Sequence, residues 1–102
     1  MENQEIYQRL GNEMEDQYLR IRSEVRNYNP KKFHSMLKAR GGYATAVALL
    51  TPIRPPDGFG TLLLCGRKDL TLEYLIFKDS QFRSLFTEQI IQNIERRLKG
   101  LI

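Results

Sequence analysis

The chain has 102 residues, of which 41% are hydrophobic and 27% are charged, with one cysteine and a net charge of +4. This length allows one domain with a modest core, and the composition excludes a disordered chain. A single cysteine excludes an intramolecular disulfide, and the longest apolar runs are far too short to cross a membrane. The acidic start is unlike a secretory signal, so we expect a cytoplasmic protein with no membrane contact.

The first half of the chain is predicted to be helical. Residues 3–27 place apolar side chains at helical spacing and predict a long amphipathic helix, which Gly11 should weaken by fraying or a break. The pair Asn29-Pro30 predicts the N-cap and first residue of a second helix, and Gly41-Gly42 predicts its end near Arg40. Residues 43–51 predict a third helix, and the proline-rich stretch that follows predicts a loop.

The pattern over residues 59–77 fits two structures. In the first, a helix over 59–65 ends at Gly66, and Asp69 caps a second helix with Glu73 directed outward. In the second, alternating apolar residues form two strands of a hairpin over 61–77. We favour the helices because the neighbouring elements are helical.

A short helix is expected over 80–86, and Thr87 is expected to cap a last helix over 88–99. The sequence therefore predicts an all-α single domain over residues 1–102, with five or six helices. Its parts would be a long N-terminal helix within 1–28 and a helical core over 29–102. The alternative fold class is α+β with a hairpin at 61–77.

No residue pattern supports catalysis. His34 and Cys65 are the only residues of their kinds and cannot complete a four-ligand zinc site. Cys65 follows three leucines, which predicts a buried and inert thiol. The glycines match no phosphate-loop pattern and are better explained as turns. We therefore expect a non-enzymatic accessory or interaction domain without catalytic residues, metal or cofactor.

The charge is unevenly distributed, because residues 1–19 hold five acids and one base whereas residues 20–40 hold seven bases and one acid. This basic segment predicts contacts with nucleic-acid phosphates, with weak sequence specificity, and Tyr28 within it could stack on a base. The candidate nucleic-acid-binding residues are Arg20, Arg26, Lys31, Lys32, His34, Lys38 and Arg40. The alternative is a protein-interaction or homodimerisation surface on the N-terminal helix, formed by Tyr7, Met14 and Tyr18.

Residues 34–99 also carry a recognisable pattern, in which Asp57-Gly58-Phe59, Gly66-Arg67, Asp69-Leu70-Thr71-Leu72-Glu73 and Leu85-Phe86-Thr87 follow one another. The pattern resembles a small bacterial domain of unknown function, DGF…L…GR.DLT.E…F..LFT…RL. The resemblance implies a bacterial protein, some of whose relatives are connected with DNA, and it implies no catalytic residue. Most of the shared positions are structural, and the sequence predicts an ion pair between Arg67 and Glu73.

Overall fold

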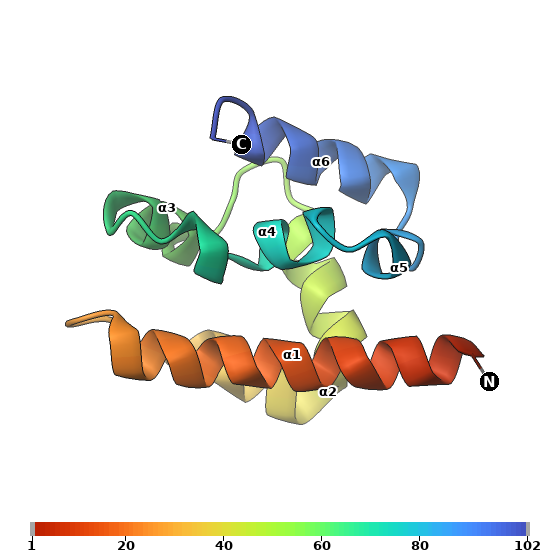
Figure 1. The fold of residues 1–102 in the computed structure, drawn as a ribbon, viewed down its shortest axis with the longest axis horizontal. Coiled ribbons are helices and arrows are strands. Elements are labelled where there is room, and N and C mark those ends of the chain that lie inside the picture. Colours follow the sequence, from red (N-terminus) through yellow and green to blue (C-terminus); the bar gives the residue numbers. More distant parts are fainter. Residues whose placement is uncertain (1, 102) are drawn as a thin grey trace. The chain divides into compact units, whose positions relative to one another are not determined.

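The computed structural model describes residues 2–101, and all the regular secondary structure among them is helical (Figure 1). No strand occurs among these residues, so the predicted all-α class is confirmed and the alternative hairpin at 61–77 is wrong. The elements are α1 (Glu2–Glu24), α2 (Lys31–Leu50), α3 (Asp57–Leu64), a 3₁₀ turn η1 (Lys68–Leu70), α4 (Leu72–Phe77), α5 (Ser80–Arg83) and α6 (Glu88–Leu98).

The chain forms two compact units, Met1–Ala46 and Val47–Ile102, each of which is described by itself. This boundary falls inside α2, later than the division at residues 28 and 29 expected from the sequence. A single domain over residues 1–102 stays a prediction.

The first unit is an antiparallel pair of helices. α1 runs without interruption (Figure 1), and its residues 18, 11 and 7 contact residues 34, 42 and 43 of α2 respectively. The buried apolar stripe of α1 follows the predicted helical spacing. Its members are Leu10, Met14, Tyr18, Ile21 and, just beyond the helix, Val25.

Two glycines explain the close approach of these helices. A Cβ atom on Gly42 would lie 2.7 Å from the Cα atom of Gly11, so the two backbones touch there. Gly11 was expected to fray or break α1, whereas α1 is continuous and Gly11 forms this contact. The predicted end of the second helix is observed as a kink, because Gly41 has φ of +82° within α2.

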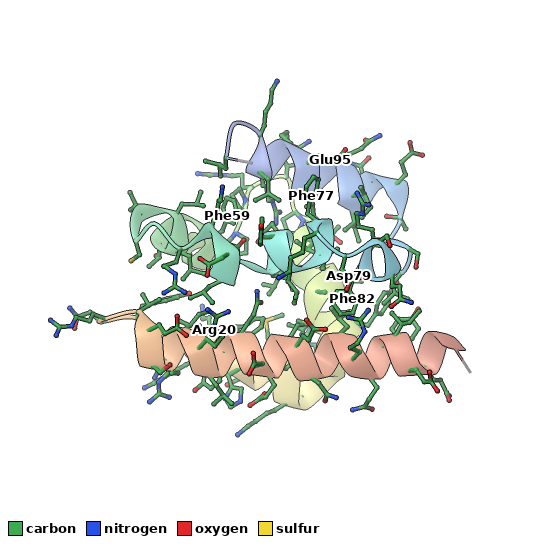
Figure 2. The ribbon with its side chains drawn as sticks, in the orientation of Figure 1. Arg20, Phe59, Phe77, Asp79, Phe82 and Glu95 are labelled. Carbon is green, nitrogen blue, oxygen red and sulfur yellow. The ribbon has the colours of Figure 1, made fainter. Side chains whose placement is uncertain are left out.

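The second unit consists of short helices with local side-chain caps. The Thr71 hydroxyl accepts from the Tyr74 amide at the start of α4, and the Thr87 hydroxyl accepts from the Ile90 amide at the start of α6. Asp79 caps α5, where it lies beside Phe82 (Figure 2). Each cap satisfies an amide that has no partner inside the helix. α4 packs against both α5 and α6.

Two predictions about the middle of the chain are wrong. Thr71 caps α4 in place of Asp69, because the residues between Gly66 and Thr71 form the separate turn η1. Cys65 is exposed, because α3 ends at Leu64 and its buried face is formed by Phe59 and Leu62. Gly66 adopts φ of +72° and ends α3 as predicted.

Candidate nucleic-acid interface

The contacts of the helix pair determine which residues of the basic segment reach solvent. The His34 ring stacks on the Tyr18 ring with centroids 3.7 Å apart and planes 8° apart. Its Nε2 atom lies 3.0 Å from a carboxylate oxygen of Glu15. His34 was predicted as a nucleic-acid contact, but its ring is largely covered by these two residues of α1.

Arg22 completes this contact on the α1 side. Its Nη1 atom donates to the Tyr18 hydroxyl at 2.9 Å, and its guanidinium lies 5.9 Å from the centre of the same ring. Tyr18 is therefore held between His34 and Arg22. Glu15, His34, Tyr18 and Arg22 together join the two helices and leave the histidine little freedom to stack on a base.

The remaining basic residues are different, because they are exposed and have no ion-pair partner within residues 4–101. These residues are Arg26, Lys31, Lys32, Lys38 and Arg40. Lys31 and Lys38 are seven residues apart in α2, which places them on the same side of the helix at about 3.6 residues per turn. Lys32 follows Lys31 about 100° further round the helix, and we refer to the three lysines together as the α2 lysine face.

Arg20 stands apart from this group. It is exposed on α1 (Figure 2) and its Nε atom donates to Glu24 at 3.0 Å, four residues along the same helix. Exposed pairs of this spacing are worth only about 0.3–0.5 kcal/mol. Arg20 is therefore a weaker candidate than the lysines, because a phosphate would compete with an acid already in contact.

Tyr28 lies in the connection between the two helices and is half-buried. Burial raises the pKa of the Tyr28 phenol above its ordinary value. The ring is thus partly enclosed by its own unit, which makes it a poorer stacking residue than the sequence indicated.

The predicted protein-interaction surface does not form as a whole. Met14 has no exposed area and Tyr18 is almost completely covered, so neither offers a surface to a partner in this conformation. Tyr7 alone is exposed, and its ring meets the Tyr43 ring edge-on with centroids 5.0 Å apart. Tyr43 was not predicted as a surface residue from the sequence, because its contact with Tyr7 depends on the approach of α1 to α2 at Gly42.

The second unit contains a buried ionic cluster that the sequence did not predict. Arg97 Nη1 donates to a Glu73 carboxylate oxygen at 2.8 Å and to the Leu49 carbonyl at 3.0 Å, and its Nη2 donates to the Pro52 carbonyl. Asn93 donates to the next carbonyl, that of Leu50, at 2.9 Å. Arg97 and Asn93 thus donate hydrogen bonds to the Leu49 and Leu50 carbonyls at the C-terminus of α2. Such carbonyls lack partners inside the helix and attract positive charge.

This cluster corrects two expectations. Glu73 was expected to face outward, but it is 4% exposed, because Arg97 requires a counter-charge at that depth. Arg67 was expected to pair with Glu73, but its guanidinium contacts Asp69 at 3.0 Å. Burial raises the pKa of the Glu73 carboxyl above its ordinary value, and the guanidinium of Arg97 partly opposes the shift.

No group of three or more His, Cys, Asp and Glu side chains among the described residues could hold a metal ion. None of the helices in that part of the chain is long and apolar enough to cross a membrane.

Comparisons with protein-family models, curated proteins and solved structures found no match to the chain. The resemblance to a bacterial domain therefore stays an expectation from the sequence. The candidate interface depends on the geometry of the first unit alone.

Proposed function

We propose that the protein is a non-catalytic domain that binds nucleic acid through phosphate contacts made by the first unit. The observation that supports this proposal best is the α2 lysine face together with Arg26 and Arg40. All five side chains are exposed and have no ion-pair partner within residues 4–101. Exposed cations without counter-charges are available to phosphates and release condensed counterions on binding.

The distribution of the charges along the chain, and not the net charge of each unit, supports a binding site in the first unit. Residues 1–46 and residues 47–102 each contain eight bases and six acids, so the two units have the same net charge. In the second unit Arg67 and Arg97 are paired with acids, and the exposed bases are spread along residues 54–99, whereas five exposed bases of the first unit lie within residues 26–40. In the first unit all six acids belong to α1, and α2 from Lys31 to Arg40 contains no acid, so this part of α2 carries only positive charge.

The binding should be weakly dependent on sequence. Lysine and arginine contacts to phosphates orient a protein on nucleic acid but do not read bases. Residues 43–51, which follow the kink, contain almost no side chain able to read a base edge. An affinity of about 10⁻⁴ to 10⁻⁶ M at physiological salt is expected for binding of this kind.

Charge reversal of the α2 lysine face tests the proposal. In the variant Lys31→Glu/Lys32→Glu/Lys38→Glu, affinity for a labelled oligonucleotide should fall about tenfold or more at low salt. The slope of log affinity against log salt should also become shallower, by about 2 for single strands if three phosphate contacts are lost. Fluorescence anisotropy over a series of salt concentrations measures both quantities.

The matched control is Arg54→Glu/Lys78→Glu/Lys99→Glu, which makes the same change in net charge at exposed positions of the second unit. The control should retain most of the affinity. Equal losses in the two variants would show that net charge alone acts, and absence of binding to any oligonucleotide at low salt would remove the proposal.

The alternative of self-association through α1 receives no support from a specific contact. Two of its three predicted residues are buried within the described residues. We therefore do not propose it as the function.

A further inference from the structure

Ser35 lies among the lysines of the α2 lysine face. In a helix, residues three and four positions apart are neighbours on the surface, with Cβ atoms about 5–6 Å apart. Lys31, Lys32 and Lys38 are three such neighbours of Ser35, and the fourth is the small residue Ala39. All of these residues are exposed and precede the kink in α2, so the regular spacing of the helix holds across them.

The position of Ser35 is on the exposed side of α2 within the first unit. Leu37 is buried and is two residues from Ser35, so the two side chains leave the helix about 160° apart. His34, which contacts Glu15 and Tyr18 of α1, leaves the helix about 100° from Ser35. The lysines around Ser35 therefore face solvent, whereas the contacts with α1 lie on other sides of the helix.

The Ser35 hydroxyl supplies a hydrogen-bond donor between these cations. The side chains of Ser35 and of the three lysines have no hydrogen-bond or ion-pair partner within residues 4–101. The short side chains of Ser35 and Ala39 leave room beside the helix for a ligand, which the long and flexible lysine side chains can reach from three directions. Each lysine ammonium carries three donors and no acceptor. The face can thus surround one anionic group with three ammonium groups and a hydroxyl.

A terminal phosphate matches this set of donors better than a phosphate inside a strand. A terminal phosphate carries a charge of about −1.5 to −2 at pH 7 and three acceptor oxygens. A phosphate inside a strand carries one negative charge and has only two oxygens outside the chain. Neighbouring ammonium groups repel one another, and the greater charge of a terminal phosphate offsets more of this repulsion.

We propose that Ser35, Lys31, Lys32 and Lys38 form a site for the terminal phosphate of a nucleic-acid strand, to which the Ser35 hydroxyl donates a hydrogen bond. This proposal rests on the proposed function and deepens it, because it specifies which phosphate the α2 lysine face binds most tightly. The protein then prefers the phosphorylated end of a strand to the interior of the same strand.

The test compares the binding of three single strands, labelled at the 3′ end, by fluorescence anisotropy. The first strand has a 5′-phosphate and the second a 5′-hydroxyl. The third has a 5′-hydroxyl and two additional nucleotides, which match the charge of the first. The native chain should bind the 5′-phosphorylated strand about fivefold or more tightly than either of the others. Equal affinity for the first and third strands would overturn the proposal and leave binding to internal phosphates in place, whereas absence of binding to all three would overturn the proposed function itself.

Substitution of Ser35 tests the hydroxyl without changing the charge. Ser35→Ala should lower the preference for the 5′-phosphorylated strand about threefold, because one hydrogen bond to a charged group is lost. Ser35→Thr keeps the hydroxyl and should keep the preference. Ser80→Ala is the matched control, because Ser80 is an exposed serine on α5 of the second unit, and it should bind all three strands as the native chain does. An undiminished preference in Ser35→Ala, or an equal loss in Ser80→Ala, would overturn the proposal.

Competition with inorganic phosphate separates a strand end from free phosphate as the ligand. At constant ionic strength, the unlabelled 5′-phosphorylated strand should displace the labelled one at a concentration about tenfold or more below that of inorganic phosphate. The reason is that the strand adds phosphate contacts to the other exposed cations of the first unit. Displacement by inorganic phosphate at an equal or lower concentration would assign the site to free phosphate and overturn the proposal.

Discussion

At the scale of single residues, Thr45 is a buried side chain whose hydroxyl group lacks a hydrogen bond. It has no exposed area, and its hydroxyl oxygen has no hydrogen-bond partner within the described residues. Burying a hydroxyl without a partner costs about 1–3 kcal/mol. Replacing Thr45 by a residue of the same shape without a hydroxyl should therefore stabilise the fold.

Thr45→Val should raise the free energy of unfolding by about 1 kcal/mol, because valine keeps the branched shape and removes the unpaired hydroxyl. Urea denaturation followed by circular dichroism measures the change. Thr45→Ser is the control, because it keeps the hydroxyl and loses the methyl group, and it should be less stable than the native chain. A Thr45→Val variant less stable than the native chain would show that the hydroxyl has a partner in solution.

Residue-scale predictions from the sequence succeeded where the cause was local and failed where it was not. Thr87 was predicted as a cap from its position before an apolar periodic segment, and its hydroxyl does accept from the Ile90 amide. Glu73 was predicted outward because an acid is normally solvated, and only Arg97, 24 residues further along, makes its burial tolerable.

At the scale of elements, two glycines lie at the contact between α1 and α2, and only one of them lacks space for a side chain. A Cβ atom on Gly42 would lie 2.7 Å and 2.9 Å from backbone atoms of Gly11, closer than real Cβ contacts. A Cβ atom on Gly11 would come no closer than 3.9 Å to Gly42, which is an ordinary contact. The same substitution should therefore have opposite effects at the two positions.

Gly42→Ala should lower the free energy of unfolding by about 1–3 kcal/mol, because α1 and α2 must move apart. Gly11→Ala should raise it by up to about 1 kcal/mol, because alanine favours the helix interior and finds space. Thermal and urea unfolding of both variants measures the two changes in stability. Each variant is the control for the other, because both replace one glycine by alanine. A shift of the same sign in both would contradict the close contact.

The existence of most elements followed from the sequence, and their mutual packing did not. Gly41 with positive φ and Gly66 with positive φ occur where the sequence predicted helix ends, because glycine adopts this conformation at little cost. Gly11 could not be interpreted in the same way. Its role depends on a backbone 31 residues away, which no local pattern specifies.

At the scale of the whole molecule, one buried cation connects three segments that are distant in sequence. Arg97 of α6 contacts the end of α2, the loop at Pro52, and Glu73 of α4. Removal of one member of a buried ion pair costs about 3–5 kcal/mol, because the other charge stays buried. Arg97 should therefore contribute more to stability than any exposed arginine.

Arg97→Met should lower the free energy of unfolding by about 3 kcal/mol near neutral pH and make it more dependent on pH. Burial already raises the pKa of Glu73, and Arg97 opposes this shift. A carboxyl with a raised pKa in the folded state contributes stability that is present below its unfolded pKa, about 4.3, and is lost as the pH rises. The variant should therefore lose stability from about pH 4 upward more steeply than the native chain.

Urea denaturation at several pH values checks this expectation, and Lys99→Met, at an exposed position nearby, is the control for the loss of one charge. The double variant Glu73→Gln/Arg97→Met should lose the additional pH dependence, because its buried groups no longer titrate. If the free energy of unfolding of Arg97→Met changed with pH as steeply as that of the native chain, Glu73 would not be buried with Arg97 as its partner.

The sequence by itself determined the helical class, the long first helix, the Thr87 cap, the helix ends at Gly41 and Gly66, and the position of the basic segment, because these depend on neighbouring residues. Only the tertiary structure decided that His34 is covered by Tyr18, that Tyr43 meets Tyr7 at the surface, and that Glu73 is buried with Arg97. The physical reason is that burial and pairing depend on residues brought together from distant parts of the chain. A charge or ring is available to a ligand only where that packing leaves it exposed.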